Sequence, residues 1–250
     1  MSEKYRRRSV LKYIGSATTI GALSTVGGTT IATEEENGTT MHEAGVKDEF
    51  DRLFKLGEFQ EAISLLEANG VKYSATKTSL DSFQESPGGI SPQDDLDKGD
   101  TFLWLCGGER REDVYGATLG WNPSRTGDLL DCSGPKDVVG ISFSDDRWRF
   151  IPGSDDLGEY TDNFNPNPEG CTARYSDEAV IAGFDDPQYM MIELEKMEEG
   201  DANIYGHYSH NWDPYCVGGG SVSFGIQAGA LQVSVDGLDH WEKSAPTMVR

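Results

Sequence analysis

Basic residues are scarce in this 250-residue sequence. Lysine and arginine together number 21, against 43 aspartates and glutamates, and the formal net charge at pH 7 is −22. Binding to nucleic acids through their phosphates needs a basic face, so this shortage excludes that class of function. The same shortage argues against docking on an anionic lipid surface.

Long apolar runs and catalytic motifs are missing as well. Beyond residue 32, no stretch of about 20 strongly apolar residues occurs, so we expect no stable membrane span there. The sequence holds no nucleophile elbow, no phosphate loop and no zincin helix. The apolar share of 36% and the aromatic share of 10% are nevertheless enough to fill a core, so we expect a folded chain of one or two domains.

The N-terminus, in contrast, is basic. Residues 1–32 hold five basic residues and one acidic residue. Arg7-Arg8-Ser9-Val10-Leu11-Lys12 precedes a weakly apolar segment from Tyr13 to Ala32, and small residues precede a cleavage site expected between Ala32 and Thr33. This order resembles a twin-arginine signal peptide with Arg7 and Arg8 as the export motif. The resemblance implies the twin-arginine translocase as a partner during export, and a secreted or cell-surface location. An uncleaved anchor helix is the alternative, which the glycines of the segment disfavour.

The remaining 218 residues are strongly acidic. Since residues 1–32 account for five of the 21 bases and one of the 43 acids, residues 33–250 carry 16 bases and 42 acids, a net charge of −26. Such a chain repels itself in dilute buffer, whereas at molar salt the Debye length falls to about 3 Å and screens the repulsion. Signal and composition together resemble the exported proteins of haloarchaea, and an ordinary acidic secreted protein is the alternative.

We expect the residues directly after the signal to be flexible and those from residue 47 to be helical. Residues 33–46 are polar and acidic, which predicts a flexible tail, and Asn37-Gly38-Thr39 is a sequon that would allow glycosylation of Asn37 after export. Residues 47–73 have apolar side chains at helical spacing on both sides of Gly57, which predicts a short two-helix hairpin.

Part of this hairpin, Leu56 to Ile63, resembles the turn of a tetratricopeptide repeat. The motif occurs once and corresponds to about half a repeat, and a solenoid needs about three repeats. We therefore expect no peptide-binding array, and expect the hairpin to cover one side of the following domain.

The sequence pattern from residue 101 to 250 predicts a β domain, which a linker or loop precedes. Residues 74–100 are poor in apolar periodicity and rich in turn formers, so we expect a linker or long loop there. From residue 101 to 250, about nine short β-branched and aromatic runs alternate with Gly, Asp and Pro. The fold class predicted is therefore mainly β, an antiparallel β-sandwich or open barrel preceded by the helical hairpin.

Four cysteines lie in this presumed exported part, none of them in Cys-x-x-Cys spacing. They are Cys106, Cys132, Cys171 and Cys216. An even set of cysteines in an exported domain predicts two disulfides, with three pairings open. Free buried thiols and zinc thiolates are the alternatives.

Metal and cofactor sites are weakly indicated. His207, His210 and Asp213 could each bind a transition metal, but aromatic neighbours indicate a strand, in which residues three apart face opposite ways. We therefore interpret the histidines as surface or edge-strand residues and expect no metal and no cofactor. Adjacent aspartates carry little information in a chain with 42 acids.

Tryptophan offers the best indication of binding. Exposed indoles can stack on sugar rings, and Trp148, which lies between two arginines, is predicted to be the most accessible and a ligand contact. The leading hypothesis is a non-enzymatic extracellular or cell-surface interaction module with an unknown ligand. One alternative is a secreted hydrolase with a carboxylate pair. Another is the precursor of a secreted antimicrobial peptide, with the glycine-rich C-terminal part released near Tyr215.

Overall fold

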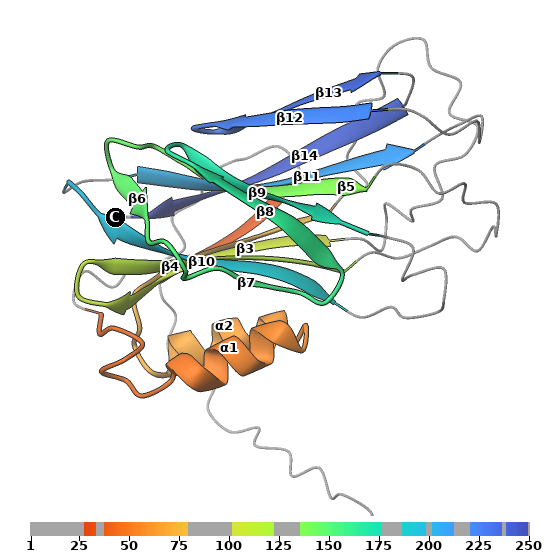
Figure 1. Ribbon diagram of the computed structural model, residues 1–250. Helices are drawn as coiled ribbons and strands as arrows, with labels where there is room; N and C mark the ends of the chain where they lie inside the picture. The colour runs from red at the N-terminus through yellow and green to blue at the C-terminus, as the bar shows by residue number, and fades with distance from the viewer. Residues whose placement is uncertain are drawn as a thin grey trace, which may run out of the picture.

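The computed structural model describes residues 28–33, 38–79, 102–122, 136–176, 187–198, 202–212, 221–236 and 239–249 (Figure 1). In this part, the protein is mostly antiparallel β-structure with two helices, which confirms the fold class predicted from the sequence. Most of the predicted signal peptide lies outside the described residues, as do Asn37, Cys132, Asp213 and Cys216. Within the described ranges, no helix is long and apolar enough to cross a membrane.

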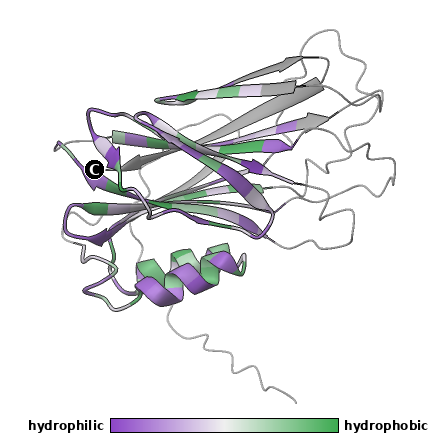
Figure 2. Ribbon diagram, in the orientation of Figure 1, coloured by the Kyte–Doolittle hydropathy of each residue, from purple (hydrophilic) through white to green (hydrophobic). Residues whose placement is uncertain are grey.

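The predicted helical hairpin is present. Its helices are α1 (Lys47–Lys55) and α2 (Phe59–Ala68). Gly57 turns the chain between them at φ 71°, and a Cβ at this position would lie 2.0 Å from the Pro187 ring, so the turn requires glycine. Both helices are amphipathic and turn their apolar sides toward the sheet above them (Figure 2).

The sheet that the helices cover has the order β1-β2-β3-β4-β10-β6, with β7 paired to β10 as well. All its pairings are antiparallel. Its strands are β1 (Gly28–Thr33), β2 (Tyr73–Ser79), β3 (Phe102–Arg111), β4 (Val114–Asn122), β10 (Gln188–Lys196), β6 (Trp148–Phe150) and β7 (Asp156–Leu157).

A second antiparallel sheet, of order β14-β11-β5-β9-β8, faces the first (Figure 1). Its strands are β14 (Asp239–Val249), β11 (Ala202–Trp212), β5 (Asp137–Phe143), β9 (Gly170–Tyr175) and β8 (Thr161–Asn167). A separate hairpin, β12 (Ser221–Gln227) and β13 (Ala230–Asp236), lies on the outer side of this sheet, where Ile226 approaches Gly140 and Gly170. Helices, two sheets and the outer hairpin thus form successive layers.

Two hydrophobic cores lie on the two sides of the first sheet. Leu103 and Leu105 of β3 point into the sandwich, whereas Trp104 and Cys106 point toward the helices. A strand buried on both faces has no polar side, which explains the unbroken apolar run at this point of the sequence. The helix-side core also contains Phe54 of α1, so the hairpin covers the outer face of this sheet.

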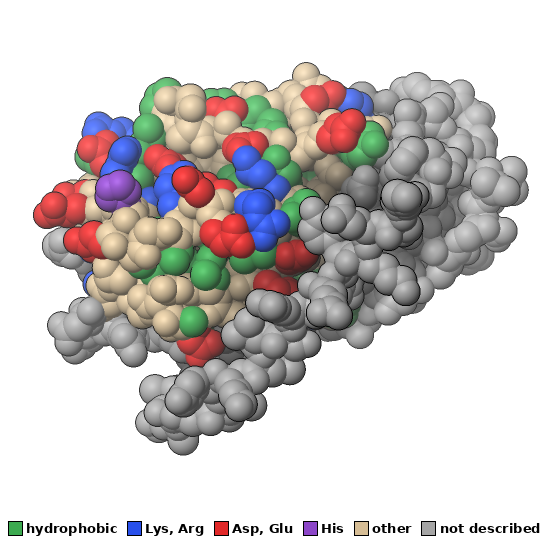
Figure 3. Space-filling model, turned by 90° about the horizontal axis from the view of Figure 1, so that it is seen from below, with side chains coloured by type: hydrophobic (Ala, Val, Ile, Leu, Met, Phe, Trp, Pro, Cys, Tyr) green, Lys and Arg blue, Asp and Glu red, His purple; other side chains and the backbone are tan. Residues whose placement is uncertain are grey.

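Charged groups fix helix α1 to the sheet. Arg110 of β3 is only 4% exposed and its Nη1 donates to Asp51 Oδ1 of α1 at 2.5 Å. Lys55 pairs with Asp156, which lies in β7. On the face viewed from below in Figure 3, acidic and basic side chains are interspersed over the helical side.

Two predicted boundaries need correction. Residues 74–79, assigned to the linker, form most of β2 and pair with β3. Residues 38–46, assigned to the flexible tail, are packed, because Met41 is 1% exposed and Val46 is 7% exposed. Thr39 forms a bridge with Val71, which ties this segment to the end of the helical hairpin.

Strand β1 overlaps the predicted signal peptide. Gly28–Thr33 pairs antiparallel with β2 over its full length. Cleavage between Ala32 and Thr33 would remove five of its six residues, 28 to 32. The outer edge of β2 would then lose this partner.

Candidate ligand-binding groove

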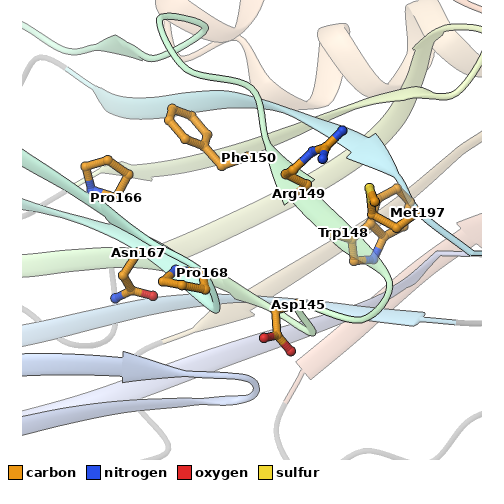
Figure 4. Close-up of a pocket in the computed structure, with 8 residues that line it drawn as sticks. All are labelled: Asp145, Trp148, Arg149, Phe150, Pro166, Asn167, Pro168 and Met197. Carbon is orange, nitrogen blue, oxygen red and sulfur yellow. The ribbon is translucent and has the colours of Figure 1, made fainter.

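A groove of about 380 Å³ opens at the edge of the sandwich, where β6 of the first sheet approaches the turn after β8 of the second (Figure 4). This volume lies in the range of about 300–1,000 Å³ common for small-molecule sites. The groove is lined by Asp145, Trp148, Arg149, Phe150, Pro166, Asn167, Pro168 and Met197. These residues come from three separate parts of the chain, which the sandwich topology brings together.

Trp148 lines the groove, but it is not the exposed residue that the sequence analysis predicted. Only 2% of it is exposed, because β6 pairs with β10 and its indole packs against Tyr115 with ring centroids 5.3 Å apart. Its Nε1 is buried and has no hydrogen-bond partner among the described residues. A buried indole N–H without an acceptor costs free energy, which the packing of the ring in the core offsets.

The other apolar lining residues are more accessible. Met197 is 45% exposed, Pro166 and Pro168 are exposed, and Phe150 is half-buried beside Phe164, with ring centroids 5.6 Å apart. An accessible methionine with two proline rings and an aromatic edge forms an apolar surface that a ligand can contact without moving the core.

Polar groups lie beside this apolar surface. Asp145 is exposed. The Arg149 side chain is 61% exposed, although its Nε donates to Glu195 Oε2 at 3.0 Å. Asn167 Oδ1 accepts a hydrogen bond from the Glu169 backbone N–H at 2.9 Å, which fixes the turn after β8. The groove therefore offers a carboxylate, a guanidinium and an amide to a ligand.

The carboxyl groups that line the groove differ in number from those of a typical glycosidase site. Asp145 is the one carboxylate among its lining residues, whereas glycoside hydrolysis uses two carboxyl groups about 5–9.5 Å apart. Among the residues that the structure describes, no group of three or more His, Cys, Asp or Glu side chains is placed to hold a metal ion.

The two histidines of β11 are buried, so their interpretation as surface or edge-strand residues is wrong. Strand β11 is central, between β14 and β5, and both side chains are at most 1% exposed. They do face opposite ways. His210 Nδ1 lies 3.0 Å from Asp137 Oδ1 inside the sandwich, and His207 Nε2 lies 2.7 Å from Ser142 Oγ on the outer face.

The prediction of two disulfides is wrong, because Cys106 and Cys171 are free. Cys106 belongs to the helix-side core and Cys171 to the sandwich core, so the first sheet separates them. Burial raises the pKa of each thiol to about 12, which leaves both thiols protonated and unreactive at neutral pH. The other two cysteines lie outside the described residues.

Comparison with known proteins adds little to this description. No protein-family model and no curated protein matches the chain. Among solved structures, one described as "Complete structure of manganese lipoxygenase of Gaeumannomyces graminis and partial structure of zonadhesin of Komagataella pastoris" aligns with 72% of this chain and 67% of its own. Its sequence identity is 8% and its TM-score is 0.22, which is too low to carry an argument about fold or function.

Sequence reasoning selected one lining residue, Trp148, and missed the others. The run Asn165-Pro166-Asn167-Pro168 shows a turn, but it does not show which strand lies opposite that turn. Met197 directly follows β10 and looked like an ordinary strand residue. The pairing of β6 with β10, which no local pattern encodes, brings these residues to one groove.

Proposed function

We propose that this protein is an exported, halophilic binding module of the extracellular space or cell surface, and that the groove beside β6 is a non-enzymatic ligand site, which binds its ligand without turnover. The observation that carries the proposal is the groove itself, with an accessible apolar surface, one carboxylate, one guanidinium and one amide around it. Such a combination suits recognition of a ligand that has both an apolar face and hydroxyl groups.

A neutral saccharide is the ligand class that fits these groups best. A sugar ring has a C–H face for Met197 and Phe150, and hydroxyls that can donate to Asp145 and accept from Arg149. A net charge of −26 on residues 33–250 disfavours polyanionic ligands.

Export and salt dependence complete the proposal. The arginine pair Arg7-Arg8 supports passage through the twin-arginine translocase, which carries folded substrates. The acidic composition supports work at high ionic strength, where the repulsion between carboxylates is screened. Binding should therefore be measured in molar KCl.

The groove can be tested by screening neutral glycans against the full chain in molar KCl and measuring affinity and turnover of any glycan that binds. Arg149→Ala and Met197→Ala should each weaken binding about tenfold, or about 1.4 kcal/mol, because each removes a contact at the groove. The glycan should be recovered unchanged.

Matched controls exist among residues that do not line the groove. Arg111 is 62% exposed and pairs with Glu193, much as Arg149 pairs with Glu195, and Leu56 is 54% exposed on the helical side. Arg111→Ala and Leu56→Ala should bind like the wild type. Equal effects of groove and control substitutions would contradict the groove as the site, and turnover of the glycan would contradict a non-enzymatic role of the groove.

A further inference from the structure

A serine and a histidine meet on the outer face of the second sheet, away from the groove. Ser142 of β5 and His207 of β11 lie on adjacent strands, and Ser142 Oγ is 2.7 Å from His207 Nε2. Both side chains are fully buried, and Tyr205 stacks beside the imidazole with ring centroids 6.4 Å apart. The pair belongs to neither hydrophobic core.

Ser142 Oγ has hydrogen-bonding neighbours in the Gly229 backbone and the His207 ring. The Gly229 backbone N–H donates to Ser142 Oγ at 3.0 Å, so the serine oxygen is an acceptor in that contact. Burial lowers the pKa of His207 to about 4, and the imidazole is therefore neutral near pH 7. In the neutral tautomer that carries its proton on Nδ1, His207 Nε2 accepts from the Ser142 hydroxyl, which is the arrangement that activates a serine oxygen.

The tip of the β12–β13 hairpin covers this pair. Gly229 lies in the turn between the two strands at φ 82°, while Gln227, Ala228 and Ala230 around it are exposed. Figure 1 shows the hairpin as an outer layer on the second sheet. The buried apolar side chains described in this hairpin, Ile226 and Leu231, lie on the strands beside the turn and not in the turn itself.

We infer that Ser142 is a latent nucleophile, that His207 is its general base, and that the β12–β13 tip is the flap that uncovers them for small acyl esters. When the flap opens, Ser142 Oγ forms a bond to the ester carbonyl carbon and its proton passes to His207 Nε2. The bond to the alcohol oxygen breaks, and the alcohol leaves with that proton. Water then splits the acyl–Oγ bond and restores the serine.

The inference uses none of the groove residues, so the two sites can be tested separately. A fluorophosphonate is the probe, because it reacts with an activated serine by forming an Oγ–P bond and releasing fluoride. The full-length protein in molar KCl should be labelled at Ser142, as located by peptide mass mapping. Labelling should be absent in Ser142→Ala and at least tenfold slower in His207→Gln.

Two further measurements separate this role from simple packing. Gly229→Ala places a Cβ at a φ of 82° and 3.3 Å from the Tyr205 ring, so it should loosen the flap and speed the labelling of Ser142. The wild-type rate should be constant near neutral pH and fall as the pH approaches about 4, where His207 takes up a proton. Ser209→Ala, which removes another fully buried hydroxyl of β11, should leave the rate unchanged.

Three results would overturn the inference. One is the absence of label at Ser142 in both the wild type and a folded Gly229→Ala variant. Another is labelling confined to exposed serines such as Ser223. The third is labelling of Ser142 at the same rate in the wild type and in a His207→Gln variant that keeps the wild-type circular dichroism spectrum.

Discussion

His210 and His207 stand three residues apart on one strand, and their surroundings have little in common. His210 lies inside the sandwich against the Asp137 carboxylate, whose Oδ2 also accepts from the Tyr208 hydroxyl at 2.6 Å. His207 lies on the outer face against the Ser142 hydroxyl, under the tip of a hairpin. The comparison shows that the partner and the covering layer, rather than burial alone, decide what a histidine can do.

Disrupting the interior site around Asp137 should cause the largest loss in the free energy of unfolding. Asp137 is fully buried and accepts hydrogen bonds from two side chains, so Asp137→Ala leaves Tyr208 and His210 without their acceptor. We expect a loss of about 3–5 kcal/mol in the free energy of unfolding, measured by urea denaturation in molar KCl. Asp162→Ala, at an exposed carboxylate paired with Lys136, is the control and should cost at most about 1 kcal/mol. Similar losses for the two variants would contradict a special role of the interior site.

His207 at the outer site should make the free energy of unfolding depend on pH. The pKa of His207 is about 4 in the folded protein, below its ordinary value of 6.5, so the unfolded state binds the proton more readily. The resulting stability is fully present above pH 6.5 and is lost as the pH falls toward 4, a change of about 3 kcal/mol. Urea denaturation across this range, with His207→Gln for comparison, measures it. The variant should lose this part of the pH dependence, and an unchanged profile would exclude His207 as its source.

Removing only the Tyr208 hydroxyl should lower the free energy of unfolding by less than removing the Asp137 carboxylate. Tyr208→Phe removes the hydrogen bond to Asp137 Oδ2 and keeps the ring that packs near Trp121, with centroids 6.4 Å apart. A hydrogen bond to a charged group contributes about 1.5–3 kcal/mol, so the free energy of unfolding should fall by that amount. A loss as large as that of Asp137→Ala would show that the tyrosine, and not the carboxylate, organises the site.

The sequence predicted the parts of the fold that depend on local pattern. Apolar residues on both sides of Gly57 predicted the two helices, and the alternation from Met190 to Leu194 fits strand β10. Strand β2 was missed because Tyr73–Ser79 contains small and polar residues that are buried only by the helices and by β3. Met41 and Val46 were missed because single apolar residues in a polar segment have no periodicity.

The candidate sites depend on strand order, which local patterns do not encode. Nothing in the residues around His207 shows that β11 lies between β5 and β14, and this central position is what buries the side chain. Ser142 lies far from His207 in the sequence, and the antiparallel register brings the two together. The groove depends in the same way on β6 lying at one edge of the first sheet.

The most direct test of the proposed binding function is the ¹H–¹⁵N spectrum of the indole groups during titration with a glycan in molar KCl. Trp148 lines the groove and Trp121 does not, although both rings belong to the sandwich core, and neither Nε1 has a hydrogen-bond partner among the described residues. A glycan that binds in the groove should shift the Trp148 indole signal and leave that of Trp121 in place. A saturable titration that leaves the Trp148 signal unmoved, or that shifts both signals equally, would contradict the proposal.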